Sequence, residues 1–412
     1  MADSPLRISS VDALRGLAIL GILVVNVQSF ALVAAARWNP TVQGNLAGAN
    51  WWVWLGTHVI FDGKFTAIFA MLFGASIVLQ AEGCARRGVS AARTHYRRMA
   101  VLLALGLLHA HLLWYGDWLA ILAVCGAVAF LYRGLPARTL ATAGVLVFAI
   151  GSVISVAVAL SLPWRSPETV ERLVADWAPS PEAIAAEVAV YRSGWLDQMR
   201  HRVPTAIRLE TSGLATRGLW QMTGLMLVGM ALLKLGVLGA GRSPVFYAAM
   251  AAVGTSVGIP LVLHGVGRSM ASGWDIRVHL ATDGLFNYWG GLLVSLSWIA
   301  TVMLLIRLGC RMKTLAAVGR LALTNYLMQT LICTTIFYGH GLGLFARIDR
   351  VGQLEIVAGV WAVQLITSTW WMRHFAFGPA EWLWRSIAYG RWTPIRRASS
   401  DPPGTAAGPD AG

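Results

Sequence analysis

The chain contains few charged residues, and this shortage excludes most classes of soluble protein. Only 13% of its 412 residues are Asp, Glu, Lys or Arg, whereas 57% are hydrophobic. Soluble globular proteins are about 45–50% apolar and about 25% charged. The composition therefore rules out a soluble enzyme, a disordered chain and a nucleic-acid-binding module. It predicts an all-α, polytopic helical membrane protein.

Acidic residues and lysine are scarce as well. The chain has 19 acidic and 33 basic residues, a formal net charge of +14, and its lysines are Lys64, Lys234 and Lys313. In a chain this apolar, we expect the basic excess in cytoplasmic loops that face anionic lipid. The lipid bilayer is therefore the first predicted partner, and no nucleic acid is expected.

Cysteine is rare, and no enzyme motif of a common type is present. The four cysteines, Cys84, Cys125, Cys310 and Cys333, form no CxxC or Cys/His spacing. This pattern predicts neither a disulfide framework nor a zinc site. The chain also lacks the Walker A, dinucleotide-binding, GxSxG and HExxH motifs. We therefore expect no metal and no tightly bound cofactor.

Long apolar runs dominate the sequence. A bilayer-spanning helix needs roughly 17–25 residues, and about ten segments reach or approach this length. They are Leu17–Ala36, Phe65–Ala81, Met99–Tyr115, Trp118–Tyr132, Thr139–Leu162, Leu219–Leu238, Val245–Leu263, Leu285–Leu308, Leu321–Phe337 and Ile356–Met372. The stretch Trp51–Phe61 is too short to span alone. It is an interfacial helix, a re-entrant segment or the N-terminal extension of the second span.

Basic residues gather in alternate loops between these runs. The richest groups lie at 86–98 and 307–320, whereas the short loops on the other side hold few arginines. Short loops rich in Lys and Arg stay on the cytoplasmic side of a membrane. The pattern therefore predicts about ten transmembrane helices with both termini cytoplasmic.

The expected spans divide the chain into four parts. Residues 1–162 form an N-terminal five-helix half, 163–217 an extracytoplasmic segment, 218–397 a C-terminal five-helix half and 398–412 a disordered, Pro/Gly-rich tail. In the second part, Ser180 followed by proline and glutamate is a helix start. The apolar residues that follow at helical spacing are Ile184, Val188, Tyr191, Trp195 and Met199. They predict an amphipathic helix that lies on the membrane or over the mouth of a cavity.

Polar residues within apolar runs are costly, so each is a candidate functional residue. Asp12 and Arg15 are spaced i, i+3 and share a helix face. They form either a salt-bridged helix start or a site where Arg15 holds an anion such as phosphate. Asn26 lies about three turns deeper on nearly the same face, as a helix–helix hydrogen-bonding group or a functional one.

Two further groups lie at or near the outer ends of spans. Asp62 and Lys64 begin the second span and His58 precedes them by one turn, as interfacial anchors or as a functional group. His109 and its neighbour His111 face different sides of a helix, which argues against a two-histidine metal site. Asp117 follows at the end of that helix.

Asp117 gives His109 two open interpretations. A carboxylate bonded to an imidazole fixes its tautomer and raises its basicity, which suits a general base. The alternative is a histidine at the membrane–water interface. In the ninth span, Asn325, Tyr326 and Gln329 make an unusually polar face, which either bonds neighbouring helices or lines a cavity.

Across nearly its whole length the chain resembles the YeiB family of bacterial inner-membrane proteins. The motifs that carry this resemblance are DALRGLAILGILVVN (Asp12–Asn26), KFTAIFAMLFGA (Lys64–Ala75), LGLLHAHLLWYGDWL (Leu105–Leu119), GRLALTNYLMQTLICTTIFY (Gly319–Tyr338) and FGPAEWLWR (Phe377–Arg385). The resemblance implies a multi-pass protein of the bacterial inner, cytoplasmic, membrane. It also implies a C-terminal domain of unknown function. Transport has been suggested for the family, without a defined substrate.

The first of these motifs also resembles the first span of heparan-α-glucosaminide N-acetyltransferase and of acyltransferase-3 proteins. Those families move an acyl group from cytoplasmic acyl-CoA to an acceptor across the membrane, so residues 1–162 resemble an acyltransferase core. The spacing from Arg15 to Asn26 is similar to that of the heparan enzyme. The catalytic histidine of those families has no counterpart at the matching positions, and His58 or His109 would have to replace it.

This resemblance implies an acyl-CoA-dependent acyltransferase. Arg15 would hold the donor phosphates, and His109, oriented by Asp117, would be the general base. Asn26 and Lys64 would polarise the thioester carbonyl. The candidate substrate-binding residues are Asp12, Arg15, His58, Asp62, Asn325, Tyr326 and Gln329. Acyl-CoA is the expected co-substrate, and a small molecule is the expected acceptor.

Two other functions stay open. A small-metabolite transporter would use the same polar residues along a path at the membrane midplane. A membrane protein without turnover would need none of them. Assembly into a homo-oligomer is also left open.

Overall fold

The computed structural model describes residues 5–392 and 394–396, with side chains from Ser9 onward. Within these residues the regular structure is helical, apart from one isolated bridge between Phe375 and Arg396. The expected all-α class is therefore confirmed. The tail at 398–412, predicted to be disordered, lies outside the described residues.

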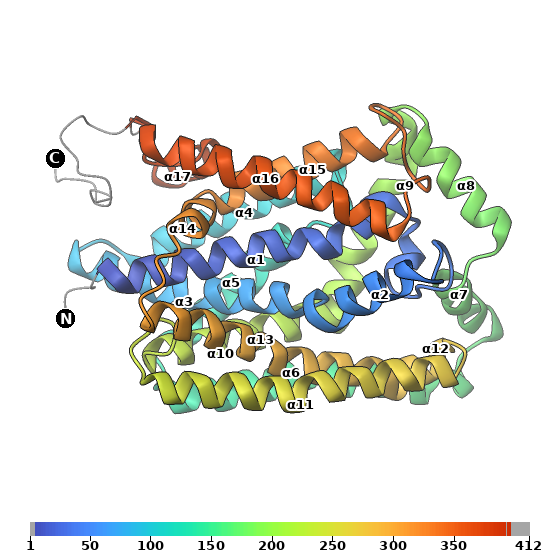
Figure 1. Ribbon diagram of the computed structural model, residues 1–412, viewed down its shortest axis with the longest axis horizontal. Coiled ribbons are helices and arrows are strands. Elements are labelled where there is room, and N and C mark those ends of the chain that lie inside the picture. Colours follow the sequence, from blue (N-terminus) through green and yellow to red (C-terminus); the bar gives the residue numbers. More distant parts are fainter. Residues whose placement is uncertain (1–4, 393, 397–412) are drawn as a thin grey trace.

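The helices run mostly along one axis, as a bundle (Figure 1). They are α1 (Pro5–Ala31), α2 (Ala49–Gly56), α3 (Lys64–Arg86), α4 (Ala91–Leu112), α5 (Leu119–Ala129), α6 (Ala137–Ser161), α7 (Pro167–Trp177), α8 (Pro181–Arg192), α9 (Trp195–Arg208), α10 (Leu219–Lys234), α11 (Pro244–Ala271), α12 (Ile276–Val278), α13 (Gly284–Arg307), α14 (Lys313–Arg320), α15 (Ala322–Phe337), α16 (Arg350–His374) and α17 (Pro379–Tyr389). Three π-helical turns join them, η2 (Thr57–Phe61), η5 (Leu209–Gly218) and η6 (His279–Asp283), and there are short 3-10 turns at 34–37, 130–132 and 162–164.

Six helical segments of the described chain are long and apolar enough to cross a membrane. They are Ser9–Ala31, Ala49–Arg86, Ala137–Trp164, Pro244–Ala271, Ile276–Arg307 and Arg350–His374. The other four expected spans coincide with α4, α5, α10 and α15, which are shorter or less apolar. The predicted count of about ten is therefore not confirmed.

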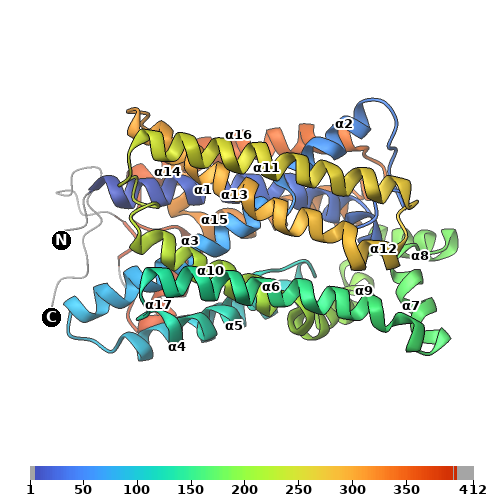
Figure 2. The same cartoon turned by 90° about the horizontal axis from the view of Figure 1, so that it is seen from below.

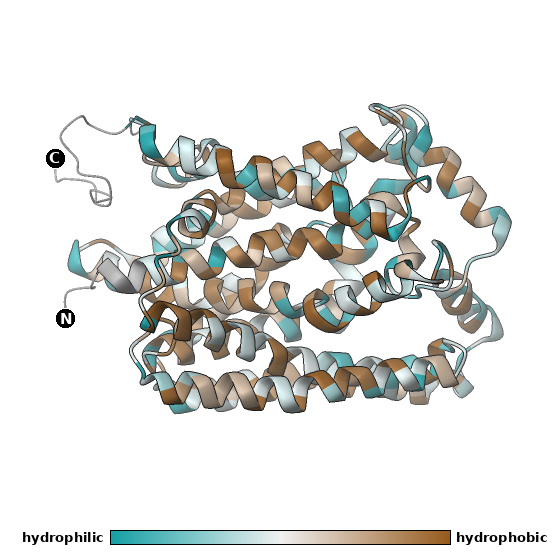
Figure 3. Ribbon diagram, viewed as in Figure 1, coloured by the Kyte–Doolittle hydropathy of each residue, from teal (hydrophilic) through white to brown (hydrophobic). Residues whose placement is uncertain are grey.

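The start of α1 and helix α17 lie at one end of the bundle, and α7 and α8 lie at the other (Figures 1 and 2). We call these the α17 end and the α8 end. Figure 3 shows hydrophobic residues along the middle of the helices and more hydrophilic residues toward both ends. Which end faces the cytoplasm stays a prediction, made from the basic loops near the α17 end.

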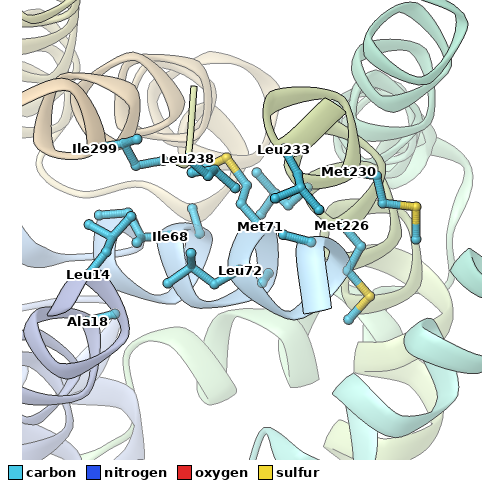
Figure 4. Close-up of a cluster of buried hydrophobic side chains, with 14 of the residues drawn as sticks. Leu14, Ala18, Ile68, Met71, Leu72, Met226, Met230, Leu233, Leu238 and Ile299 are labelled. Atoms are coloured by element: carbon cyan, nitrogen blue, oxygen red, sulfur yellow. The ribbon is translucent and has the colours of Figure 1, made fainter. Parts of the chain in front are cut away.

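The core is built where helices from both expected halves of the chain meet. Helix α10 packs against α3 and α6, and α11 packs against α13. Glycines allow the closest approach, because a side chain at Gly229 would collide with the backbone of Met71, and one at Gly74 with that of Met226. Small residues at such crossings are typical of membrane helices. Figure 4 shows the side chains of Met71 and Met226 in this core.

The stretch Trp51–Phe61 is the N-terminal extension of the second span. Helix α2 continues through η2 and reaches α3 after a short break at Asp62 and Gly63, so that one apolar segment runs from Ala49 to Arg86. Gly63 has φ of +78°, a left-handed conformation that glycine adopts without steric cost. The break therefore places Asp62 and Lys64 at a helix junction.

The expected amphipathic helix is present but divided. Its start is confirmed, because the Ser180 side chain accepts a hydrogen bond from the backbone N–H of Ala183 at 3.3 Å. It ends at Arg192, and α9 begins anew at Trp195 after an extended Ser193 and Gly194. The apolar residues keep one helical spacing across Ser193 and Gly194, so their spacing did not predict this break. Helix α8 covers the α8 end of the bundle, where Tyr191 stacks on Phe345.

Candidate functional site

A cavity of about 240 Å³ lies between α1, α3, α4, α5, α15 and α17. Its walls are mainly apolar. The apolar side chains include Ile19, Ile22, Phe69, Phe73, Met99, Leu102, Leu119, Leu122 and Leu323. Three arginines, Arg15, Arg98 and Arg320, also line it, from α1, α4 and α14. The cavity therefore combines an apolar interior with a strongly basic rim.

Arg15 forms the ion pair that its spacing predicts. Its guanidinium lies 2.7 Å from an oxygen of Asp12 and donates to the Ser76 hydroxyl at 3.2 Å. The Arg15 side chain keeps 25% of its surface exposed. The Asp12–Arg15 pair thus stands beside the cavity, with Arg15 directed at it.

Two polar atoms in the cavity wall lack partners. His95 is buried, stacks on Phe130 and donates from Nε2 to the carbonyl of Gly126 at 3.1 Å. Its Nδ1 and the Nε2 of Gln80 are buried with no hydrogen-bond partner in the described chain. Buried polar atoms are almost always satisfied, so each exception needs an explanation such as a ligand. Sequence reasoning missed both residues, because Gln80 stands alone at the end of the run Phe65–Ala81 and His95 lies in a basic loop, and neither belongs to a recognisable motif.

Helix α17 closes one side of the cavity through Glu381 and Trp384. The Glu381 carboxylate accepts from the backbone N–H of Leu323 at 2.6 Å and from the Thr324 hydroxyl at 2.5 Å, so it caps the N-terminus of α15. Burial raises the pKa of Glu381 above its ordinary value, against the opposing effect of these hydrogen bonds. Trp384 lies under the Arg98 guanidinium at 4.4 Å. The carboxylate that faces the basic rim is thus already engaged by a helix.

His109 and Asp117 form the pair that the sequence predicts, and α15 completes it. His109 Nδ1 lies 2.9 Å from Asp117 Oδ1, and Nε2 lies 3.0 Å from the Thr330 hydroxyl. The Tyr326 hydroxyl donates to the same Asp117 oxygen at 3.2 Å. His109 is buried and is not among the residues that line the cavity, whereas Tyr326 is. Tyr326 therefore connects the pair to the cavity.

Asn325 and Gln329 bond helix α16. The Asn325 amide donates to the Ser368 hydroxyl at 3.0 Å, and the Gln329 amide donates to the side-chain oxygen of Gln364 at 3.0 Å. Both residues are buried between helices and do not line the cavity. Of the two interpretations, this geometry matches the helix–helix one.

His58, Asp62 and Lys64 meet in a separate cluster. Asp62 lies 2.5 Å from the Arg37 guanidinium and 3.1 Å from His58 Nδ1. The fully buried Lys64 ammonium donates to the carbonyl of His58 at 2.7 Å and to the Asn287 side chain at 2.5 Å. None of the three predicted residues lines the cavity.

The structure thus divides the predicted catalytic residues among three places. His109 and Asp117 lie together, Lys64 belongs to the Asp62 cluster, and Asn26 makes no side-chain hydrogen bond with any described residue. The cavity gathers Arg15 and Tyr326 from the predicted set and adds Gln80 and His95. The roles of all these residues stay predictions.

Comparison with known proteins places the chain in a family. Residues 232–391 match the family model described as protein of unknown function (DUF418). The chain is 32% identical to the uncharacterized protein YeiB of Escherichia coli (strain K12), over 92% of this chain and 95% of that one. It is 28% identical to the uncharacterized protein YxaH of Bacillus subtilis (strain 168), over 95% of this chain and 96% of that one. With its long apolar helices, the chain is therefore a multi-pass membrane protein that belongs to the YeiB family.

Proposed function

We propose that this protein is a membrane acyltransferase whose cavity binds an acyl-CoA donor. The proposal rests on one observation: the same cavity is lined by three arginines and by mainly apolar side chains. Arginine suits phosphate because its planar fork bonds two oxygens at once. An apolar interior suits an acyl chain. A donor with phosphates at one end and a thioester at the other matches both.

The size of the cavity indicates which part of the donor it takes. A pocket for a drug-sized ligand measures about 300–1,000 Å³, and this cavity measures about 240 Å³. It holds the acyl group and part of the arm that carries it, while the nucleotide stays outside. Exposed arginines nearby, Arg87 in the α3–α4 turn and Arg93 and Arg97 in the first turns of α4, supply positive charge for it.

Tyr326 is the group best placed to handle a proton. In acyl transfer, an acceptor hydroxyl or amine attacks the thioester carbonyl, the C–S bond breaks, and the proton lost by the acceptor returns to the thiolate of CoA. Tyr326 lines the cavity, and its hydroxyl donates to Asp117, which His109 holds in place. Asp117 and His109 are then positioning residues that act through Tyr326.

Binding of acyl-CoA to purified, detergent-solubilised protein tests the donor site. We expect saturable binding of acetyl-CoA and decanoyl-CoA in calorimetry. Replacing Arg98 with Gln removes a charged contact worth about 1.5–3 kcal/mol, so affinity falls at least about tenfold. Arg311→Ala, in the loop between α13 and α14 and outside the cavity, is the matched control and keeps full affinity. No binding by a folded sample, or an equal loss in both variants, refutes the donor site.

Replacement of Tyr326 by Phe tests the chemistry separately from binding. Loss of a proton-handling group lowers a rate by about 10²–10⁴-fold. We expect Tyr326→Phe to bind acetyl-CoA normally and to release CoA thiol far more slowly in membrane vesicles that contain the natural acceptors. Unchanged thiol release would exclude Tyr326 from the reaction.

Transport is the second candidate, and the break at Asp62 and Gly63 favours it. Discontinuous helices with buried charges form the substrate sites of many transporters. Uptake of a small metabolite into sealed vesicles without any acyl-CoA would support this alternative. Such uptake, together with an absence of acyl-CoA binding, would replace the acyltransferase proposal.

A further inference from the structure

Helices α4 and α15 both border the cavity, but they are not a closely packed pair in the described chain. Helix α4 packs against α3, α5, α9 and α17, and α15 packs mainly against α1 and α17. Where α4 meets α5 the approach is close, because a side chain at Gly106 would collide with the backbone of Ala120. Small residues allow membrane helices to approach in this way, and α15 contains no glycine. A seam therefore runs between α4 and α15 along one side of the cavity.

Hydrogen bonds hold this seam at its two ends. At one end, α17 bridges the two helices, because Trp384 Nε1 donates to the carbonyl of Arg98 on α4 at 3.0 Å and Glu381 caps α15. At the other end, His109 Nε2 of α4 lies 3.0 Å from the Thr330 hydroxyl of α15. Between these two places, no hydrogen bond joins described residues of α4 and α15. We call this unbonded stretch the α4–α15 window.

Apolar side chains fill the α4–α15 window. Leu102 of α4 and Leu323 of α15 line the cavity and belong to one buried cluster. Leu105 and Leu327, one turn further along the same helices, are half-buried and pack against that cluster. The exposed apolar side chains that follow on these helices are Leu108, Met328 and Leu331. Side chains, which change rotamer readily, are therefore what separates the cavity from an apolar surface that faces lipid.

We propose that the cavity takes a long acyl chain, whose distal end passes through the α4–α15 window into the bilayer. This inference rests on the proposed acyl-CoA donor and names its class, a long-chain acyl thioester. The arginine rim holds the phosphate-bearing end, and the cavity of about 240 Å³ holds the part of the chain next to the thioester. Methylene groups beyond that part lie among leucines and lipid instead of water, which favours longer chains.

Photo-crosslinking in lipid nanodiscs locates the end of the chain. The probes are octanoyl-CoA and palmitoyl-CoA analogues, each with a diazirine next to its terminal methyl group, and peptide mass spectrometry identifies the attached residues. We expect the octanoyl probe to label the cavity wall, at Phe69 or Phe73. The palmitoyl probe should label Leu108, Met328 or Leu331, outside the window. Excess acetyl-CoA, which does not enter lipid, suppresses the labelling that depends on the site.

Replacement of Leu327 by Trp plugs the window. We expect Leu327→Trp to keep its affinity for acetyl-CoA and to lower the suppressible labelling by the palmitoyl probe at least about fivefold. Met328→Trp, at the adjacent exposed position, is the matched control and leaves both quantities unchanged. Leu105→Trp plugs the window from α4 and is expected to act as Leu327→Trp does. It replaces Leu327→Trp in the test if that variant does not fold.

Two results would overturn the inference alone. In the first, acetyl-CoA binds, but the palmitoyl probe gives no suppressible labelling outside the window. In the second, the plugging variants and Met328→Trp change the labelling equally. Both results leave the donor site supported, because acetyl-CoA still binds. Absence of binding by every acyl-CoA refutes the proposed donor site and the inference with it.

Discussion

Two sets of buried polar groups in this protein differ in whether their hydrogen bonds are complete. The first set lies around α15 and comprises Asn325, Gln329, Gln364 and Ser368 on one side and His109, Asp117 and Thr330 on the other. None of their side-chain nitrogens or oxygens is buried without a partner. The second set, Gln80, His95 and His279, keeps unpartnered atoms.

This difference separates two uses of polarity inside a membrane protein. A completed hydrogen bond between helices stabilises their arrangement and leaves nothing for a ligand to bind. An unpartnered buried atom costs about 1–3 kcal/mol, and a ligand that bonds it recovers that cost. We therefore expect substitutions in the first set to change stability and substitutions in the second set to change binding.

Removal of His109 is expected to have the largest effect on stability. His109→Leu removes the imidazole from the buried Asp117 carboxylate, which keeps its hydrogen bond from Tyr326, and from the Thr330 hydroxyl. Breaking a buried, hydrogen-bonded pair by removing one member costs about 3–5 kcal/mol. Equilibrium unfolding in detergent measures this loss. The double variant His109→Leu, Asp117→Leu should recover part of the lost stability. A His109→Leu protein with unchanged stability would contradict the assignment of His109 to the set that stabilises the fold.

Removal of Gln329 is expected to have a moderate effect. Gln329→Leu removes the donor to Gln364 and a second hydrogen bond to the carbonyl of Ile19 at 3.3 Å. Interhelical hydrogen bonds in membrane proteins contribute about 0.6–1.7 kcal/mol each. We expect a loss of about that size in the free energy of unfolding, with acyl-CoA affinity unchanged. A loss of affinity at full stability would move Gln329 into the ligand-binding set.

Replacement of His95 is expected to change stability least and binding most. His95→Phe keeps the stack on Phe130 and removes the unpartnered Nδ1, at the cost of one hydrogen bond to Gly126. These changes partly cancel, so we expect a shift of less than about 1 kcal/mol in stability. Calorimetry should show weaker acyl-CoA binding, at least about fivefold if Nδ1 accepts a bond from the donor. Unchanged affinity would exclude His95 from the site.

Local sequence spacing was sufficient for several of these features. The i, i+3 spacing of Asp12 and Arg15 predicted a pair, and the distance of eight residues across a helix end allowed Asp117 to reach His109. Ser180 marked a helix start from its own chemistry and that of the next two residues. Each of these interactions joins residues that are close in the chain, where helical geometry determines which side chains are in contact.

The remaining features depend on helices that are distant in the chain. Thr330 joins His109, and Tyr326 joins Asp117, across more than 200 residues. No local pattern distinguishes Gln80 or His95 from other polar residues at the end of a span. The hydrophobic residues likewise keep helical spacing through Trp195, so this spacing did not predict the break at Ser193 and Gly194.

The sequence by itself determined that this protein is a helical, multi-pass membrane protein with a basic excess at alternate loops. It did so because a segment inside the hydrocarbon of a bilayer must be apolar and must form its backbone hydrogen bonds internally, as a helix does. Long apolar runs that meet this requirement can be recognised in the sequence. Only the tertiary structure decided which polar side chains are satisfied and which face a cavity. Hydrogen-bond satisfaction is a property of pairs, and most of the deciding pairs here join different helices.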